Sequence, residues 1–193
     1  MKRKSSLLTA ILLGGSLMLA ACGGESASKT EESQQKAVKL EETGPLTINP
    51  EISSEQEILS KGPNGEDAFS AIKLQLTEEE LKKIKEGKYK AAIVMHYTGN
   101  DYSTAQINGL KAAFERMGIE VVAVTDGQFK PEKQIADIET VLAKSPDIIV
   151  SLPVDPTSTA ASFKKAAEAG VKLVFMDVPP TGLTAGKDYL SVV

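Results

Sequence analysis

Tryptophan is absent from this chain of 193 residues, and cysteine and histidine occur once each, as Cys22 and His96. A single cysteine excludes a disulfide within the chain, and these two residues are too few for a zinc site. Neither G-x-G-x-x-G nor G-x-x-x-x-G-K-[ST] follows the first predicted strand, which argues against a loop that holds nucleotide phosphates. The G-x-S-x-G motif of serine hydrolases is missing as well. The sequence therefore predicts no cofactor, no metal and no enzymatic centre of these kinds.

Basic residues are also in the minority. The chain has 22 Lys and Arg residues against 26 Asp and Glu residues, a formal net charge of −4. Nucleic-acid binding needs a clustered basic surface, so this balance argues against a nucleic-acid partner. Aromatic residues are sparse, but the apolar content is ordinary for a globular protein, so stability is expected to come from burial alone.

The N-terminus has the three parts of an export signal. In "MKRKSSLLTAILLGGSLMLAAC" a basic start is followed by an apolar run and then by small residues. The apolar run is too short for a comfortable membrane span, as is typical of signal peptides. Residues 1–21 are therefore predicted to be a signal peptide.

The end of this segment, Leu19-Ala20-Ala21-Cys22, resembles a bacterial lipobox. The resemblance implies that Cys22 receives a diacylglyceryl group at sulfur and becomes the mature N-terminus, because a thiol is the nucleophile for such lipidation. A plain secretory signal with an incidental cysteine is the alternative. Residues 22–76 are predicted to be the lipidated cysteine and a flexible polar tether, in which "GPNGED" forms a turn. Whether "AFSAIKLQL" packs on the following domain is left open.

Residues 77–193 alternate between helix and strand patterns. "TEEELKKIKEG" predicts a helix in which Thr77 and Glu80 form a capping box and Gly87 closes the end. The predicted strands that follow are "YKAAIVMH", "IEVVAV", "PDIIVSLP", "VKLVFMD" and the final "YLSVV". Near-continuous apolar runs of this kind are typical of strands buried on both faces. This alternation predicts an α/β fold with a doubly wound parallel sheet.

Three helices are predicted between these strands. Ser103 and Gln106 are expected to cap the first of them, and Pro131 suits the first turn of the second. The third is expected over residues 157–169. The apolar positions that share a helix face are Ile107, Leu110, Phe114 and Met117, then Ile135, Ile138, Val141 and Leu142, then Ala160, Phe163, Ala166 and Ala167.

Ligands of such sheets bind beyond the carboxyl ends of the strands, which selects the loops 96–102, 126–129, 153–157 and 177–181. These loops contain carboxylates, amides and aromatic rings, namely Tyr97, Asn100, Asp101, Tyr102, Asp155 and Asp177. Carboxylates accept hydrogen bonds from neighbouring hydroxyls, and aromatic faces cover the C–H side of a sugar ring. The loops therefore predict a site for a polyol.

Each of these residues also has a purely structural interpretation. Asp155 could equally cap the helix that follows, whereas Asp177 has no local capping role and is favoured as a ligand contact. Tyr102 is slightly favoured for stacking on a ligand over packing on its helix, and Tyr97 and Asn100 are evenly balanced. Two further sets are expected to be structural: His96 as a hydrogen-bonded histidine, and Asp126 and Gln128 as turn or rim residues.

Residues 88–193, with the segments "AAIVMHYTGNDYSTAQINGLKAAFERMGIEVV" and "DIIVSLPVDPTSTAASFKKAAEAGVKLVFMD", resemble the ribose/galactose-type periplasmic sugar-binding proteins of ABC importers. The resemblance implies two similar lobes of the periplasmic-binding-protein type I, with the sugar between them. Asn100, Tyr102, Asp155 and Asp177 match positions of the family's sugar site. Ribose-type members commonly have an Arg after the last of these, where this chain has Val178, and the difference argues against ribose itself.

In that family the strand that matches "YLSVV" leaves the first lobe and enters the second. Residues 77–193 are therefore expected to be an N-terminal lobe, truncated at the hinge before the second lobe. A lobe by itself should bind its ligand weakly, because closure of the two lobes completes the contacts and excludes water.

The sequence thus predicts a lipid-anchored solute-binding component of an ABC importer, at the cell membrane and facing the extracellular or periplasmic side. The expected partners are a small sugar or polyol, the ABC permease subunits and the membrane through the lipid anchor. A sensor lipoprotein that presents its ligand to a membrane receptor fits the same features. A glycosidase with Asp155 and Asp177 as its two carboxyl groups is disfavoured, because nothing in the sequence sets their spacing or raises a pKa.

Overall fold

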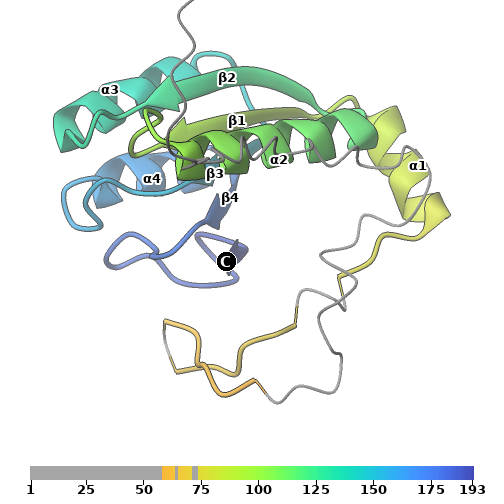
Figure 1. The fold of residues 1–193 in the computed structure, drawn as a ribbon, viewed down its shortest axis with the longest axis horizontal. Coiled ribbons are helices and arrows are strands. Elements are labelled where there is room, and N and C mark those ends of the chain that lie inside the picture. Colours follow the sequence, from red (N-terminus) through yellow and green to blue (C-terminus); the bar gives the residue numbers. More distant parts are fainter. Residues whose placement is uncertain (1–57, 64, 71–73) are drawn as a thin grey trace, which may run out of the picture. The chain divides into compact units, whose positions relative to one another are not determined.

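The computed structural model describes residues 58–63, 65–70 and 74–193, so the predicted signal peptide, Cys22 and the first part of the tether lie outside the described residues. The described chain contains a five-stranded sheet in which every pair of neighbouring strands is parallel, in the order β2-β1-β3-β4-β5 (Figure 1). The strands are β1 (Lys90–Met95), β2 (Glu120–Asp126), β3 (Ile148–Ser151), β4 (Lys172–Phe175) and β5 (Ser191–Val192). The helices are α1 (Glu78–Gly87), α2 (Asp101–Met117), α3 (Pro131–Leu142) and α4 (Ala160–Glu168). The predicted α/β fold with a parallel sheet is confirmed.

The strand order reverses next to β1. The chain runs from β1 outward to β2, and then returns across β1 to β3 and continues in the other direction. At such a switch point the loops that leave the two neighbouring strands diverge and leave a crevice at the carboxyl edge of the sheet. By this rule a ligand is expected beyond the ends of β1 and β3.

The two faces of the sheet are covered by different helices. Ile107 and Phe114 of α2 pack on one face, with Ile84 of α1 beside them. Ile138 of α3 and Phe163 of α4 pack on the other face. The apolar helix faces predicted from the sequence cover the sheet, as a doubly wound fold requires, except that Ile135 of α3 is outside both core clusters.

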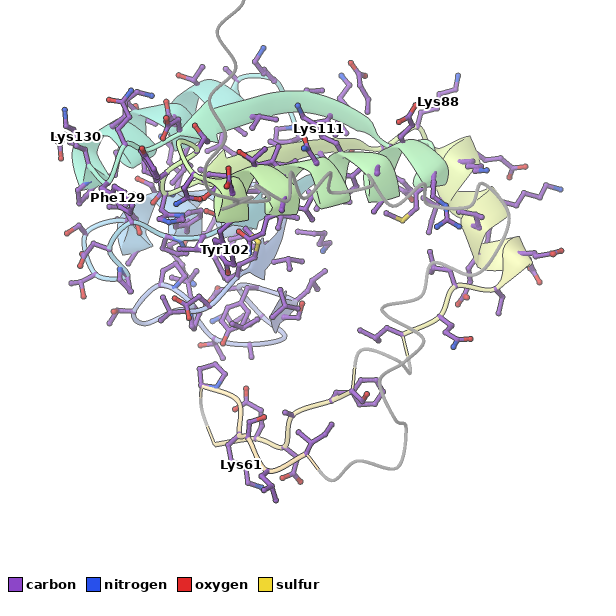
Figure 2. All side chains as sticks on the ribbon, viewed as in Figure 1. Lys61, Lys88, Tyr102, Lys111, Phe129 and Lys130 are labelled. Carbon is purple, nitrogen blue, oxygen red and sulfur yellow. The ribbon has the colours of Figure 1, made fainter. Side chains whose placement is uncertain are left out.

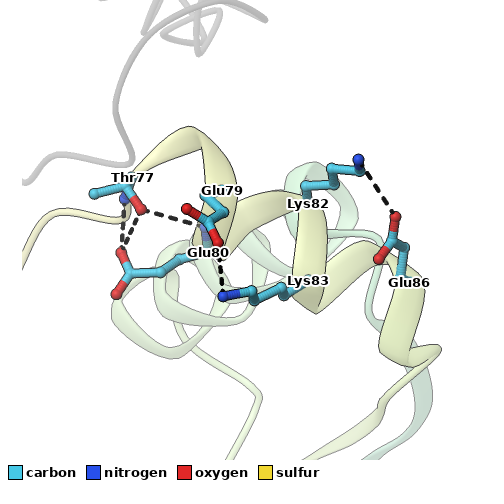
Figure 3. A network of polar contacts seen from close by, with 6 residues as sticks. All are labelled: Thr77, Glu79, Glu80, Lys82, Lys83 and Glu86. Carbon is cyan, nitrogen blue, oxygen red and sulfur yellow. Dashed lines mark hydrogen bonds and ion pairs between the residues drawn. The ribbon is translucent and has the colours of Figure 1, made fainter.

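Helix α1 begins with the predicted capping box (Figure 3). The Glu80 amide donates to Thr77 Oγ1 over 3.2 Å, and the Thr77 amide donates to Glu80 Oε2 over 2.8 Å. The hydrogen bonds that the Thr77 amide and the Thr77 hydroxyl donate to the Glu80 carboxylate hold the pKa of Glu80 below its ordinary value. The helix end differs from the prediction, because Lys88, with φ of 51°, takes the left-handed conformation while Gly87 is the last helical residue.

Replacing Thr77 with alanine should lower the free energy of unfolding by about 1 kcal/mol, since the cap satisfies amides that have no partner within the helix. Urea denaturation followed by circular dichroism measures this difference. Thr77→Ser keeps the hydroxyl and serves as the matched control. Equal stability of the alanine and serine variants would show that the capping box contributes nothing.

The starts of two helices differ from the sequence-based expectations. Helix α2 begins at Asp101, with Asn100 as its N-cap, so Ser103 and Gln106 lie inside the helix rather than at its cap. Helix α4 begins at Ala160, after the turns of residues 156–159, and not at residue 157. Asn100 accepts a hydrogen bond from the Ser103 amide in α2, and Asp155 accepts one from the Ser158 amide in the turns before α4. The apolar pattern alone does not reveal these contacts.

The last predicted strand is shorter than expected. The strand is Ser191–Val192, flanked by backbone hydrogen bonds from Leu190 to Leu173 and from Val193 to Phe175 of β4, while the Tyr189 side chain is buried in the core and Leu190 is 60% exposed. The Tyr189 ring meets Phe175 edge-on, with their centroids 5.6 Å apart. Tyr189 is therefore a core residue that precedes the strand.

A buried carboxylate, that of Asp188, stabilises the connection between β4 and β5. Asp188, whose side chain is 6% exposed, accepts a hydrogen bond from the Thr184 amide over 2.9 Å and pairs with Lys164 of α4 over 2.5 Å. The hydrogen bond from Lys164, followed by that from Thr184, lowers the pKa of Asp188 from its ordinary value near 3.8. The folded chain thus favours the ionised form of this residue.

This contribution to stability should depend on pH in one direction. Because the pKa of Asp188 is lower in the folded chain than in the unfolded chain, the stabilisation is fully present above the unfolded pKa and is lost as the pH falls through the folded pKa. The melting temperature of Asp188→Asn should therefore fall less than that of the parent chain upon acidification from neutral pH. Melting curves across the acid range measure this, and parallel curves would contradict the assignment.

The described residues before α1, which were predicted to belong to a tether, contain the predicted turn. Lys61 and Asp67 form an isolated antiparallel bridge and an ion pair, and the Gly62 amide donates to the Glu66 carbonyl over 2.7 Å. Gly65 lies in the turn with φ of 87°, which favours glycine. Across residues 58–63, 65–70 and 74–193, no helix combines the length and the apolar character that crossing a membrane requires.

Candidate functional site

The loops that leave β1 and β2 form an aromatic corner, which we define as His96, Tyr97 and Phe129. The rings of Tyr97 and Phe129 are stacked, with centroids 4.6 Å apart and planes inclined by 20°. The His96 ring meets Phe129 edge-on at 5.2 Å. Phe129 is 58% exposed, so one part of the corner is open to solvent at the carboxyl edge of the sheet (Figure 2).

The backbone of the β2–α3 loop holds Phe129 in place. The Gly127 amide donates to the Met95 carbonyl and the Phe129 amide to the His96 carbonyl, each over 2.9 Å. Gln128 and Phe129 both have positive φ, 52° and 55°, a conformation that non-glycine residues seldom adopt. Two successive residues in this region store strain that the surrounding hydrogen bonds must offset, and such strain gathers at functional sites.

Asp126 closes this loop onto the β1 loop. Its Oδ2 accepts a hydrogen bond from Thr98 Oγ1 over 2.9 Å, and its Oδ1 accepts from the Gln128 amide over 3.0 Å. Both carboxylate oxygens thus have partners within the loops. The predicted turn role of Asp126 and Gln128 agrees with these contacts.

Asn100 and Tyr102 lie at the start of α2. Asn100 Oδ1 accepts a hydrogen bond from the Ser103 amide over 2.7 Å, so this oxygen serves the helix cap. Tyr102 is in the first turn and is 62% exposed, which leaves most of its ring accessible (Figure 2). A ligand contact by Asn100 would therefore have to come from its Nδ2 group, which donates hydrogen bonds.

Asp155 is engaged in the turn before α4. Its Oδ1 accepts a hydrogen bond from the Ser158 amide over 2.6 Å, and its carbonyl accepts from Thr159 Oγ1 over 2.7 Å. The hydrogen bonds from Ser158 hold the pKa of Asp155 below its ordinary value. The carboxylate is thus stabilised in its ionised form, and one of its oxygens is occupied by the turn.

Asp177 has a different setting. It is exposed, it follows the end of β4, and its φ of 70° places it in the left-handed region that Asp and Asn tolerate best among side-chain-bearing residues. Its amide donates to the Val193 carbonyl over 2.8 Å, which fixes the backbone at this point.

The electrostatics of His96 indicate that these loops converge. Burial lowers the pKa of His96, while the negative charges of Asp126 and Asp177 act in the opposite direction. Carboxylates at the ends of β2 and β4 therefore both act on a ring at the end of β1. The β3 and β4 loops are also joined, since the Thr181 amide donates to the Pro156 carbonyl over 2.9 Å and the hydroxyls of Thr157 and Thr181 are 3.2 Å apart.

The structure thus brings predicted residues from all four loops to one edge of the sheet. Phe129 lies in one of the four loops selected from the sequence but was not named as a member of the site, because Asp126 and Gln128 of that loop were interpreted as turn or rim residues. The available signal was an aromatic residue in a polar loop directly after a buried strand. Among residues 58–63, 65–70 and 74–193, no cluster of three His, Cys, Asp or Glu side chains is arranged to hold a metal ion.

Comparisons with known proteins match the α/β part of the chain. Residues 91–191 match the family described as periplasmic binding protein domain. Similar solved structures include an ABC transporter solute-binding protein from Mycobacterium smegmatis with bound glycerol, 25% identical with a TM-score of 0.47, covering 50% of this chain and 33% of that one. The arabinose-binding protein AraP from Geobacillus stearothermophilus is 26% identical with a TM-score of 0.47, covering 51% and 34%. A solute-binding protein from Agrobacterium vitis bound with α-D-tagatopyranose is 28% identical with a TM-score of 0.47, covering 54% and 37%.

No match is found among the curated proteins. The chain spans about a third of the length of the solved structures to which it is similar. The family match covers more than half of this chain and includes all five strands except the first residue of β1 and the last residue of β5. The chain therefore belongs to the periplasmic binding protein domain family.

Proposed function

We propose that this chain is part of the sugar- or polyol-binding component of an ABC importer, and that its ligand lies over the carboxyl ends of β1 and β3. The observation that carries the proposal is the open aromatic corner, with Asp177 acting on its histidine from the end of β4. Membership of the periplasmic binding protein domain family supports it.

The chemistry of the site suits a polyhydroxylated ring. The exposed faces of Phe129 and Tyr102 can cover apolar C–H groups, while Asp177 can accept hydrogen bonds from two neighbouring hydroxyls. Tyr97 is proposed to support Phe129 from behind by stacking. Asn100 and Asp155 are proposed as polar contacts through the atoms that their capping hydrogen bonds leave available.

Attachment to the cell membrane is a further part of the proposal. It is supported by the sequence around Cys22, which has the features of a lipidation signal. A lipid anchor would hold the binding domain on the extracellular or periplasmic side, close to the permease subunits to which it delivers the ligand. Residues 22–76 would then act as the tether, and residues 77–193 as the lobe that provides one side of the site.

Amide NMR spectra of the isotopically labelled chain test the proposal, because they detect weak as well as tight binding. We expect titration with a panel of glycerol, arabinose, allose and tagatose to shift signals in the loops 96–102, 126–129, 153–157 and 177–181 for at least one member. An uncharged polymer of similar viscosity serves as the control for general solvent effects. Shifts confined to the amino edge of the sheet, or none with any sugar, would contradict the proposal.

The structure gives no support to a glycosidase. Such an enzyme needs one carboxyl group with a raised pKa to protonate the leaving oxygen. The pKa of Asp155 is lowered instead, by its hydrogen bonds with Ser158. We therefore expect that no chromophore is released from aryl glycosides, even if the chain binds them.

A further inference from the structure

A buried glutamine of α3 contacts the backbone of the loop that carries Asp155. The side chain of Gln134 is fully buried. Its Nε2 donates to the Leu152 carbonyl over 2.9 Å, and its Oε1 accepts from the Val154 amide over 2.7 Å. One side-chain amide therefore pairs with two backbone groups, as a neighbouring strand would.

The contacts of Gln134 lie just beyond the end of β3, where the loop of Asp155 begins. β3 ends at Ser151, and the last hydrogen bond toward β1 runs from the Leu152 amide to the Val94 carbonyl over 3.3 Å. Beyond that point the chain turns away, and Gln134 supplies the partners that the sheet no longer provides. Asp155 is the next residue after Val154, so the position of its backbone is set by this contact.

Gln134 is also connected to the aromatic corner. The main-chain amide of Gln134 donates to the Lys130 carbonyl over 3.1 Å, and the Lys130 main-chain amide donates to the Gly127 carbonyl over 2.8 Å. Gly127 itself lies against the β3 loop, because a Cβ atom added there would stand 3.0 Å from Val154 Cγ2. The glutamine thus lies between the loop of Phe129 and the loop of Asp155.

We propose that Gln134 is a positioning residue, which fixes the Asp155 loop relative to the aromatic corner and so sets the affinity for the sugar. This inference rests on the proposed function. If the role of Gln134 were merely structural, any other substitution that lowered the stability of the fold by the same amount would weaken binding equally. A buried amide that lacks its partners is costly, so the loop should move to find other partners when Gln134 is removed.

Gln134→Met removes both hydrogen bonds at similar volume, and Ile138→Val, one turn later on the same buried face of α3, is the matched control. We expect Gln134→Met to weaken the binding of the best sugar of the panel by about tenfold, since two buried backbone groups lose their partners. Ile138→Val should lower the melting temperature and leave the affinity within about twofold, because it removes only one methyl group from the core. Equal losses of affinity in the two variants would overturn the proposal.

A double-mutant cycle with Asp155→Asn asks whether Gln134 acts through the loop. If it does, Gln134→Met should cost clearly less affinity in the Asp155→Asn background than in the parent chain. Additive losses would overturn the proposal. Gln134→Glu, which keeps the size and the acceptor for the Val154 amide but loses the donor at neutral pH, takes the place of the methionine variant if that variant does not fold.

Hydrogen exchange separates failure of this inference from failure of the proposed function. In Gln134→Met without ligand, the amides of residues 154–155 and 157–159 should exchange faster, while those of β1 and β4 stay protected. If the parent chain binds no sugar, the proposed function fails, and this measurement alone decides whether Gln134 positions the loop. Faster exchange spread evenly over the sheet, or unchanged exchange in the loop, would overturn the positioning role.

Discussion

Replacement of Asp177 by glycine is expected to weaken sugar binding about a hundredfold, because a carboxylate that accepts two hydroxyl hydrogen bonds contributes more than a neutral acceptor. Asp177→Asn, which keeps the size but loses the charge, should weaken binding about tenfold. NMR titration of each variant with the sugar that the parent chain binds measures both differences.

The two substitutions are chosen for the backbone at this position. Asp177 has φ of 70°, which glycine adopts freely and asparagine tolerates, whereas alanine would add strain of its own. The hydrogen bond from the Asp177 amide to the Val193 carbonyl involves only the main chain and is kept in both variants. A loss of affinity can therefore be assigned to the side chain, provided that the melting temperature is unchanged.

Glu139→Gln is the matched control, since Glu139 is an exposed carboxylate on α3 rather than in one of the four loops. It changes the net charge by the same amount as Asp177→Asn and should not alter the affinity. If Asp177→Gly bound the sugar as the parent chain does, the ligand position over the carboxyl ends of β1 and β3 would have to be abandoned.

The fold could be predicted from the sequence because its signals are local and repeated. Apolar strands such as "KAAIVM" and "IIVS" are nearly continuous, and β1 and β3 are indeed buried on both faces in the middle of the sheet. Gly118, with φ of 69°, ends α2 as its place between a helix and a strand pattern indicates. Alternation of these elements leaves a parallel sheet as the simplest arrangement.

The candidate site was less predictable, because its members act through contacts between loops. Asn100 has a capping role that competes with the expected ligand role, and only the hydrogen bond with the Ser103 amide reveals it. Phe129 is an ordinary loop residue in the sequence, and its importance depends on stacking against Tyr97, which is distant along the chain.

The role of Gln134 could not be predicted from the sequence either. It precedes the apolar stripe of α3 and would be expected at the surface, yet its side chain is fully buried. Burial of an amide is favourable here only because Leu152 and Val154 present an unpaired carbonyl and an unpaired amide just beyond the end of β3. Such partners come from the tertiary structure, so a pattern of hydrophobic residues along one helix contains no sign of them.

The second prediction with a large expected effect concerns the lipid that is proposed to attach the protein to the membrane. Cys22→Ser is expected to abolish incorporation of labelled fatty acid into the protein, because the chain has no other thiol to accept the lipid. Ser26→Ala, four residues further along and outside the lipidation signal, is the matched control and should be labelled as the parent is. Metabolic labelling of cells that express the full chain, followed by isolation of the protein, measures the difference.

Labelling is a better test of the anchor than fractionation alone. A precursor that is not cleaved keeps its apolar segment and can remain on the membrane without any lipid, so the location of Cys22→Ser would not distinguish the two states. Attached acyl chains, in contrast, bind the bilayer by about 0.8 kcal/mol for each buried methylene group, and two or more chains make the attachment lasting. If the parent chain carried no label and was released in cleaved form, the plain secretory signal would be the correct interpretation of the N-terminus, and the binding domain would act without a lipid anchor.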